Sequence, residues 1–507
     1  MGQTTIVLMI LTVISKIFGF VRESVMASYI GAGELKSIYT TAMTIPTIIT
    51  SVIIVGIKSA YIPVYNKVKN EKGTKEANGF TSNLINILIV YGAISVILIL
   101  LFADPISKIF SPDLSGSSLD LAANFSRILS LSVFLSLYAS VIGGYLNIHG
   151  NFIDPAIIGF INNSIIIAST ILYAKTRNPY LLIIGTFVGL NLQFIRFPFA
   201  SKKLGFSYSK NIDFKDPYIK YLMVMILPII FSSAANQLSV LIDNSMASAF
   251  FGADSISKIF YAKTMLNFIT GVVTLSISTV TFPEIARLGQ SGEIVQMNKS
   301  VSSAIVMSML LVIPATLGMM ALSVPIIKIA FERNAFLPSD TSIVASLLVA
   351  YAPSIIFAAF MQILTNAFYS IGNSRTPVII IIIQQLLNIV MNVLLSRIFG
   401  LDGLAYATSI STIVASLILI FAFKKKVGEL ESNKGLKSII KTLIASIIIS
   451  ILARIIYEFL KKILTLLPSL FIAVAIAGLI YIVLIVLLRV PEFDKLRKSF
   501  KNKIKGN

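Results

Sequence analysis

The chain has 507 residues, of which 56% are hydrophobic and 13% charged, and apolar runs recur from end to end, so we predict an all-α polytopic membrane protein rather than a soluble globule. The absence of cysteine and the single histidine, His149, exclude disulfides, thiolate sites and multi-histidine metal clusters. The net charge of +20 could indicate nucleic-acid binding, but lysine-rich cytoplasmic loops beside anionic lipid explain it first.

Apolar runs long enough to cross a bilayer, at about 20 residues each, predict about fourteen transmembrane helices. Their expected ranges are 5–30, 36–64, 80–103, 121–148, 153–174, 180–200, 217–250, 254–284, 298–324, 339–370, 375–397, 402–423, 437–460 and 466–489. No signal-peptide cleavage pattern is visible, so we expect the first to remain a spanning helix. Lysine-rich segments between the helices and at the C-terminal end mark the cytoplasmic side, and both termini are expected there.

The first expected span contains the unusual sequence Ser-Lys-Ile-Phe-Gly-Phe-Val-Arg-Glu, from residue 15 to residue 23. A charge near the middle of a spanning helix costs about 2.5 to 3.5 kcal/mol, so it normally faces protein or a watery cavity. Residues seven apart share a stripe of a helix, which aligns Lys16 with Glu23, and Ser15 with Arg22. Gly19 between them allows a close approach or a bend. The alternative is that the charged side chains snorkel to the headgroups.

Two motifs recur in the second half of the chain. Met-Ala-Ser followed by Gly-Ala at residues 26–32 returns at 246–253, and Gly-Asn-x-x-x-Pro at 150–155 returns at 372–377. The offset is 220 residues from Met26 to Met246 and 222 from Gly150 to Gly372. An even number of spans separates equivalent points, so the halves have the same orientation. Such parallel repeats form a central cavity between two bundles and predict a transporter.

The repeat predicts the domain organisation. We expect an N-terminal lobe at 1–200, a cytoplasmic linker at 201–216 and a C-terminal lobe at 217–424. Two additional helices follow at 425–489, and a basic cytoplasmic tail at 490–507. The additional helices are expected on the outside of one lobe. They either form a groove for a lipid tail or stabilise the bundle without ligand contact.

Polar stripes predict which helices line the cavity, because a polar side chain that faces lipid has no partner. Besides the first span, three spans carry them: Thr40, Thr44, Thr47, Ser51 and Lys58 on the second, Ser232, Asn236, Ser239 and Asp243 on the seventh, and Lys263, Asn267, Thr270, Thr274 and Thr281 on the eighth. The alternative is that they join helices, at about 0.6 kcal/mol per contact. This alternative accounts for the threonine and serine hydroxyls better than for the charged side chains. We interpret five amides on spans five and eleven as interhelical packing groups: Asn162, Asn163, Gln385, Asn388 and Asn392.

Several segments resemble a known family. They are residues 15–23, Met-Ala-Ser-Tyr-Ile-Gly-Ala-Gly at 26–33, Ile45-Pro46, Gly-x-x-Ser-Ala-Tyr-Ile-Pro at 56–63, Phe260-Tyr261-Ala262 and Phe282-Pro283. They resemble MurJ (MviN)-type lipid II flippases, of the mouse-virulence-factor branch of the multidrug/oligosaccharidyl-lipid/polysaccharide (MOP) exporter superfamily. The resemblance implies an alternating-access transporter, not an enzyme. Its cargo would be undecaprenyl-pyrophosphate-linked disaccharide pentapeptide, moved to the outer leaflet of a bacterial plasma membrane for peptidoglycan and cell-wall synthesis.

The resemblance is that of a divergent member. Lys16 stands where the family usually has arginine, Arg22 matches its second arginine, and Glu23 matches the acid that follows. The departures are Ser37-Ile38-Tyr39 for Asp-Ala-Phe, Thr50-Ser51 for an Arg-Arg pair, Val55 for a glutamate, and Thr264 for an arginine, with Lys263 beside it.

We expect Lys16, Arg22, Lys58 and Lys263 to form a cationic cavity, in which arginine grips a pyrophosphate bidentately and lysine adds point charges. Other expected cavity-lining residues are Ser15, Glu23, Thr47, Ser51, Asn236, Asp243 and Asn267. We expect no cofactor, metal or nucleic acid. The expected partners of this monomer are a polyprenyl-pyrophosphate-linked glycan lipid, membrane lipids and the cell-wall synthesis machinery.

Three other functions stay open. A flippase for another polyprenyl-linked glycan, such as a capsule, teichoic or O-unit precursor, fits the same cavity and the missing arginines. A MATE-like drug or cation antiporter needs an acidic cavity, for which Asp243 and Glu23 are few. A membrane enzyme of the prenyl- or glycosyl-transfer type often needs an intramembrane carboxylate cluster with a metal, and the sequence has none.

Overall fold

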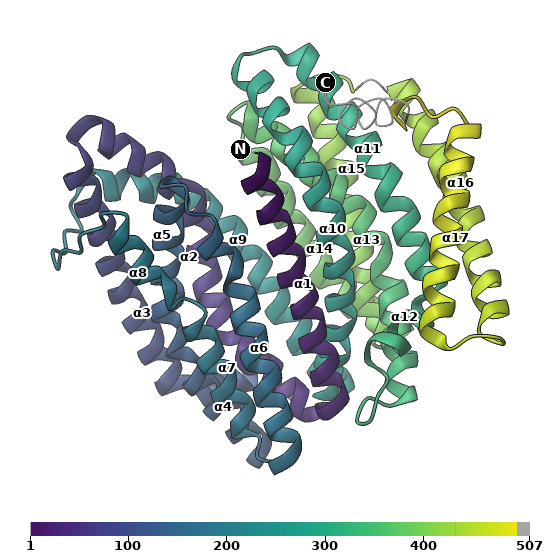
Figure 1. Ribbon diagram of the computed structural model, residues 1–507, viewed down its shortest axis with the longest axis horizontal. Helices are drawn as coiled ribbons and strands as arrows, with labels where there is room; N and C mark the ends of the chain where they lie inside the picture. Colours follow the sequence, from purple (N-terminus) through teal and green to yellow (C-terminus); the bar gives the residue numbers. More distant parts are fainter. Residues whose placement is uncertain (1, 431, 494–507) are drawn as a thin grey trace. The chain divides into compact units, whose positions relative to one another are not determined.

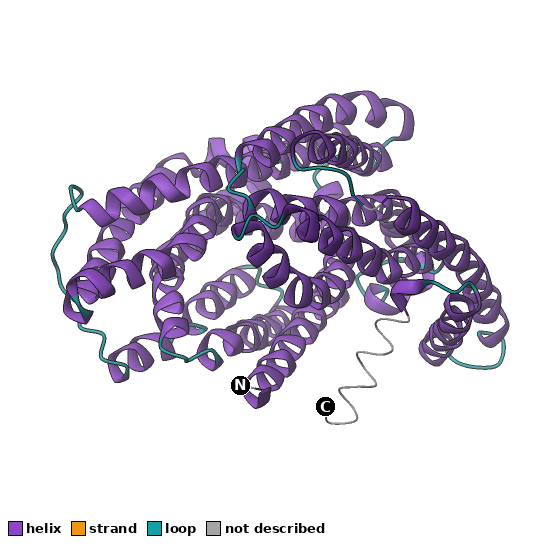
Figure 2. Ribbon diagram, turned by 90° about the horizontal axis from the view of Figure 1, so that it is seen from above, coloured by secondary structure: helices purple, strands orange, loops and turns teal. Residues whose placement is uncertain are grey.

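The computed structural model describes residues 2–430 and 432–493, and the side chains within them except those of 2–10, 269–282 and 432–434. Every regular element in these ranges is a helix (Figure 2). The helices are α1 (Gly2–Ile30), α2 (Glu34–Lys72), α3 (Thr74–Phe110), α4 (Gly116–Ser130), α5 (Ser132–Ile148), α6 (Ile153–Thr176), α7 (Tyr180–Leu192), α8 (Arg196–Lys203), α9 (Pro217–Phe251), α10 (Asp254–Gln290), α11 (Ile294–Ala321), α12 (Ser323–Phe331), α13 (Pro338–Ser370), α14 (Arg375–Phe399), α15 (Asp402–Lys426), α16 (Ser432–Leu460) and α17 (Leu466–Leu487).

Helices occupy all the expected spans, which confirms the all-α polytopic fold class. Twelve spans among the described residues are long and apolar enough to cross a membrane. The remaining two spans are covered by α1 and α10, which are 29 and 37 residues long. The fourth span is divided into α4 and α5, and the sixth into α7 and α8. The short helix α12 follows the ninth span and was not predicted.

Packing divides the chain into two compact units. Unit 1 consists of Met1–Phe260 and Arg333–Leu337, and unit 2 of Tyr261–Glu332 and Pro338–Asn507. The boundary falls inside α10, and α9 packs on α2 and α3 within unit 1. The lobes expected from the sequence repeat divide at residues 201–216, whereas the units defined by helix packing divide after Phe260.

In unit 1, the segment between α8 and α9 is fixed on α3 by a row of amide side chains. Asn78, Asn83 and Asn86 donate hydrogen bonds to backbone carbonyls of residues 205–213, at 2.8 to 3.0 Å. Asp216 then caps α9, because its carboxylate accepts hydrogen bonds from two backbone N–H groups of the first turn. The start of α9 is therefore held by unit 1.

The repeated Gly-Asn motifs form the same turn. Gly150 and Gly372 have φ values of 77° and 75°, a region that glycine enters without steric cost. Each glycine N–H bonds to the carbonyl three residues earlier, and the next N–H to the carbonyl five residues earlier. The side chains of Asn151 and Asn373 each accept from the N–H three residues on, at 3.3 and 3.2 Å. The two motifs therefore start α6 and α14 in the same way.

In unit 2, the C-terminal pair of helices packs on the elements around the ninth span. Figure 1 shows α16 and α17 side by side in yellow, and α16 packs on α11 while α17 contacts α12. Elsewhere in this unit, α14 and α15 are joined by polar side chains. Gln384 donates to Thr412 at 3.0 Å and Asn388 to Thr408 at 3.3 Å. Such bonds satisfy polar groups that lipid could not.

Candidate functional site

The charged first helix lies against α6 in unit 1 (Figure 1). The small residue Gly159 permits the approach, since a Cβ there would lie 3.2 Å from the Ser15 side chain, whereas one on Gly19 would make an ordinary contact with the Asn163 amide at 3.5 Å. The Ser15 hydroxyl donates to the Ala156 carbonyl at 3.1 Å. The motif of residues 15–23 therefore forms a helix interface, in which Gly19 lies beside Asn163.

One turn further along, this interface contains an ion cluster of three charges. Arg22 donates from Nε and Nη2 to Oε1 of Glu23, at 3.0 and 2.5 Å. Lys36, from the first turn of α2, donates from Nζ to Oε2 of Glu23 at 2.8 Å. Arg22 Nη1 also donates to Oδ1 of Asn163 at 2.9 Å. Glu23 is thus clamped between two cations, and the cluster has a formal net charge of +1.

Exposure separates the two cations. The Lys36 side chain is fully buried, and its Nζ lies 4.5 Å from the ring centroid of Phe260 and 5.2 Å from that of Tyr39. The Arg22 side chain is 23% exposed. Three of its five N–H groups are used by Glu23 and Asn163, which leaves two donors without a partner among the described residues. Arg22 can therefore bind an anion while it stays fixed.

The expected cationic residues differ in their surroundings. Lys16 is half-buried on α1 and Lys58 is exposed on α2, and neither forms an ion pair or hydrogen bond with the residues that the structure describes. Lys263, on α10 in unit 2, is half-buried with its Nζ 5.4 Å from the ring centroid of Tyr351. In unit 1 the structure therefore joins Arg22 to Glu23, and both Lys16 and Lys58 stand apart from that cluster.

Two of the expected lining hydroxyls, those of Thr47 and Ser51, donate hydrogen bonds within their own helix. Thr47 and Ser51 lie exposed and half-buried on α2, and their hydroxyls donate to the carbonyls of Met43 and Ile48, at 2.6 and 3.2 Å. A hydroxyl that donates to its own backbone presents only acceptor lone pairs outward. These two side chains offer no donor to an anion in this conformation.

The remaining expected residues lie on α9 and α10. Asp243 is 3% exposed, while Asn236 and Asn267 are exposed. The described residues include no group of three or more His, Asp or Glu side chains that could hold a metal ion. Asn236 and Asn267 place exposed amide groups on α9 and α10, and Asp243 is a buried acid on α9.

Lys36 is the site residue that sequence reasoning missed. It stands at the first position of the expected second span, where a lysine usually reaches the membrane surface. The signal that could have identified it was the buried acid, because a carboxylate inside a membrane protein needs cationic partners.

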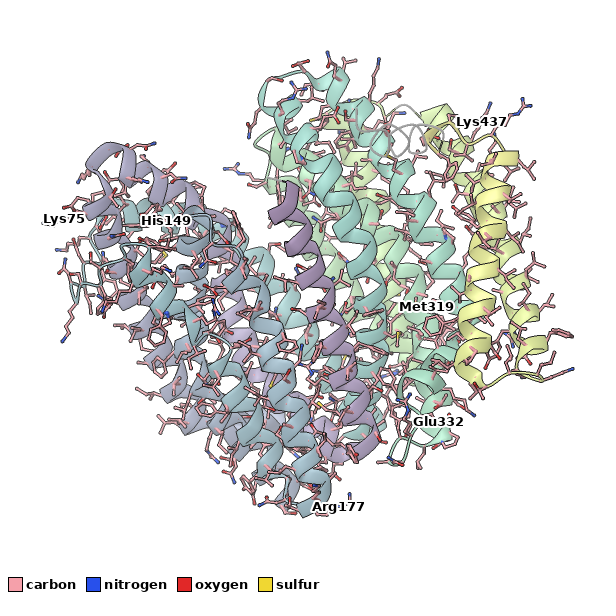
Figure 3. The ribbon with its side chains drawn as sticks, in the orientation of Figure 1. Lys75, His149, Arg177, Met319, Glu332 and Lys437 are labelled. Atoms are coloured by element: carbon pink, nitrogen blue, oxygen red, sulfur yellow. The ribbon has the colours of Figure 1, made fainter. Side chains whose placement is uncertain are left out.

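Two neighbouring cavities lie beside the C-terminal helices of unit 2. The first, of about 330 Å³, is lined almost entirely by apolar residues of α11, α16 and α17, among them Met319, which Figure 3 labels. The second, of about 320 Å³, shares Leu322 with it and is lined by the basic residues Lys328, Arg454 and Lys461. Lys328 pairs with Glu332 and Lys461 with Glu458.

Comparisons with known proteins agree with this architecture. A family model described as "Lipid II flippase MurJ" matches residues 26–476. A probable lipid II flippase MurJ from Rickettsia prowazekii is 29% identical over 440 residues, which is 86% of each chain. One from Borreliella burgdorferi is 26% identical over 442 residues, 87% of each chain.

Solved structures show the same fold. The chain matches a structure titled "Lipid II flippase MurJ, inward closed conformation" with a TM-score of 0.80 and 25% identity, over 94% of this chain and 98% of that one. An inward-facing multidrug transporter of the MATE family, in the MOP superfamily, matches with a TM-score of 0.69 over 83% of this chain and 96% of its own. At 13% identity, that second likeness concerns the fold alone.

Proposed function

We propose that this chain, which belongs to the lipid II flippase MurJ family, moves lipid II from the inner to the outer leaflet of the plasma membrane. It is a transporter and not an enzyme. The observation that carries the proposal is the ion cluster of α1, α2 and α6, in which Arg22 keeps two free donors beside a neutralised carboxylate.

Movement of lipid II across the membrane requires a cationic site inside the membrane. A pyrophosphate headgroup cannot enter hydrocarbon without compensation, whereas a polyprenyl tail can remain in lipid. The two donors of Arg22 suit phosphate oxygens, because guanidinium groups bind phosphate bidentately. We propose that Lys16, Lys58 and Lys263 also bind the headgroup during transport, as mobile point charges.

The membrane potential can favour outward movement. Each net negative charge moved fully outward across an inside-negative membrane gains about 2.3 kcal/mol per 100 mV. Only the charge that moves counts. Arg22 is fixed by Glu23 and Asn163, so it neutralises the cargo locally without travelling with it.

We propose that the apolar cavity beside α16 and α17 receives the polyprenyl tail. Its lining offers hydrocarbon contact, from Met319, Ile449 and Val474 among others. A tail held there would stay in an apolar environment while the headgroup crosses. The two added helices would then form part of the transport route.

We further propose that both termini are cytoplasmic. Figure 3 shows Lys75 and His149 towards one end of unit 1 and Arg177 at the other. This agrees with the expectation that the loops after the second and fourth spans share one side of the membrane. The lysines near residue 75 favour the cytoplasm for that side.

Complementation tests the cargo. The chain is expressed in a bacterium depleted of its own lipid II flippase, with Arg22→Ala as the inactive control at the same membrane level. Growth with the wild-type chain alone is expected. Failure despite full membrane expression would favour another polyprenyl-linked glycan as the cargo. The presence of Thr50 and Ser51 in place of the family's Arg-Arg pair would agree with that result.

A further inference from the structure

Glu23 has a different cation on each carboxylate oxygen. Oε1 accepts two hydrogen bonds from Arg22, and Oε2 accepts one from Lys36 at 2.8 Å. Glu23 is 2% exposed and Lys36 0%, so water does not screen this pair. The three charges act as one unit, with Glu23 and Lys36 buried and Arg22 partly exposed, and removal of any one changes the charge that the others present.

Lys36 itself has no route to a ligand. Besides the carboxylate, its ammonium lies 3.7 Å from Met26 Sδ and beside the aromatic rings of Tyr39 and Phe260. Arg22 is the partly exposed member of the cluster and is oriented by Asn163 from α6. The hydrogen bonds of Lys36 to Glu23 and of Arg22 to Glu23 connect it to an anion bound at Arg22.

Charge counting gives Lys36 a role. Without Lys36, Arg22 and Glu23 would form a neutral pair, in which the carboxylate neutralises the guanidinium charge. With it, Glu23 is neutralised from the other side and the cluster keeps a net charge of +1. We infer that Lys36 is a positioning residue, the fixed counter-ion of Glu23 that leaves the charge of Arg22 available to the pyrophosphate of the cargo. This inference rests on the proposed function.

The test compares Lys36→Met with the double variant Glu23→Gln/Lys36→Met. In the single variant Arg22 is neutralised by Glu23, whereas in the double variant its charge is free again. Lys69→Met is the matched control, because Lys69 is an exposed lysine in the last turn of the same helix. Purified proteins in nanodiscs are titrated with lipid II and, in parallel, with an uncharged polyprenol. Their thermal unfolding is recorded.

We expect Lys36→Met to bind lipid II about tenfold more weakly than the wild type, the scale of one hydrogen bond to a charged group. The double variant should return to within about threefold of the wild type by the same arithmetic. Polyprenol binding should stay unchanged in every variant. A general packing defect would weaken the binding of both lipids, so this comparison separates a positioning role from a merely structural one.

Wild-type affinity for lipid II in Lys36→Met, or a double variant as weak as the single one, would overturn the inference. If Lys36→Met does not fold, the double variant decides, because it must bind lipid II nearly as well as the wild type. Failure of the proposed function is a different result, in which the wild-type chain itself does not bind lipid II.

Discussion

Replacing Arg22 with alanine removes the cation through which the site contacts its cargo. The carboxylate of Glu23 is not stranded by this change, because Lys36 still donates to it at 2.8 Å. Removing one member of a buried ion pair usually costs about 3 to 5 kcal/mol when the other charge is left alone, and here it is not. Arg22→Ala should therefore fold and insert normally.

The loss of transport can be estimated from the free donors. Arg22 has two N–H groups without a partner among the described residues, and a hydrogen bond to a charged group contributes about 1.5 to 3 kcal/mol. Losing two such bonds costs about 3 kcal/mol or more, which corresponds to at least about a hundredfold loss of transport. Arg22→Lys should lose about tenfold, because one ammonium cannot reach Glu23, Asn163 and a phosphate together.

The assay is lipid II translocation in vesicles that contain equal amounts of each purified variant, with thermal unfolding as the control for folding. Arg22→Ala transport within about twofold of the wild type would refute the reasoning, since that difference is below the value of one such bond. An equal loss in Arg22→Lys and Arg22→Ala would show that geometry matters and charge alone does not suffice.

Three further predictions concern other parts of the chain. At unchanged membrane levels, Lys16→Ala should abolish translocation and Lys58→Ala or Lys263→Ala should reduce it moderately, because each change removes a cation. Normal transport by all three variants would leave Arg22 as the one proposed residue that binds the headgroup. Gly31→Ala should lower the free energy of unfolding by about 1 to 3 kcal/mol, because φ is 76° and the new Cβ would lie 2.5 Å from the Ala335 carbonyl oxygen. The control Gly33→Ala should leave thermal stability unchanged, because its new Cβ meets nothing within 4 Å. A photoreactive polyprenyl analogue should label α16 or α17 near the apolar cavity in peptide mapping, and labelling confined to other helices would exclude the tail site there.

The spans could be predicted because apolar length alone determines them. Hydropathy detects only the part of a helix inside the membrane, so α2 continues from the expected end at residue 64 to Lys72. The division of the sixth span into α7 and α8 falls among the polar residues Asn191, Gln193 and Arg196, which interrupt the apolar run and could have indicated it. The nine residues of α12 are too few to span a membrane and were read as part of a loop.

The site could be predicted only in part. The intramembrane position of Arg22 and Glu23 identified them, and Asn163 was assigned to helix packing, a role it has against Ser15 at 3.4 Å. That Asn163 also orients Arg22 depends on α1 packing against α6, a pairing between residues 141 positions apart that local patterns do not encode. The burial of Lys36 could not be predicted from local sequence, because Lys36 packs against Phe260 from α10, far away in the sequence.

The most direct measurement is translocation of two cargoes by the purified chain in vesicles. One is lipid II, and the other is a polyprenyl-pyrophosphate carrying a glycan that is not a peptidoglycan precursor. The account predicts that lipid II moves to the opposite leaflet and that Arg22→Ala stops this movement. Vesicles in which the chain moves only the other glycan, or in which lipid II moves equally well without Arg22, would contradict it.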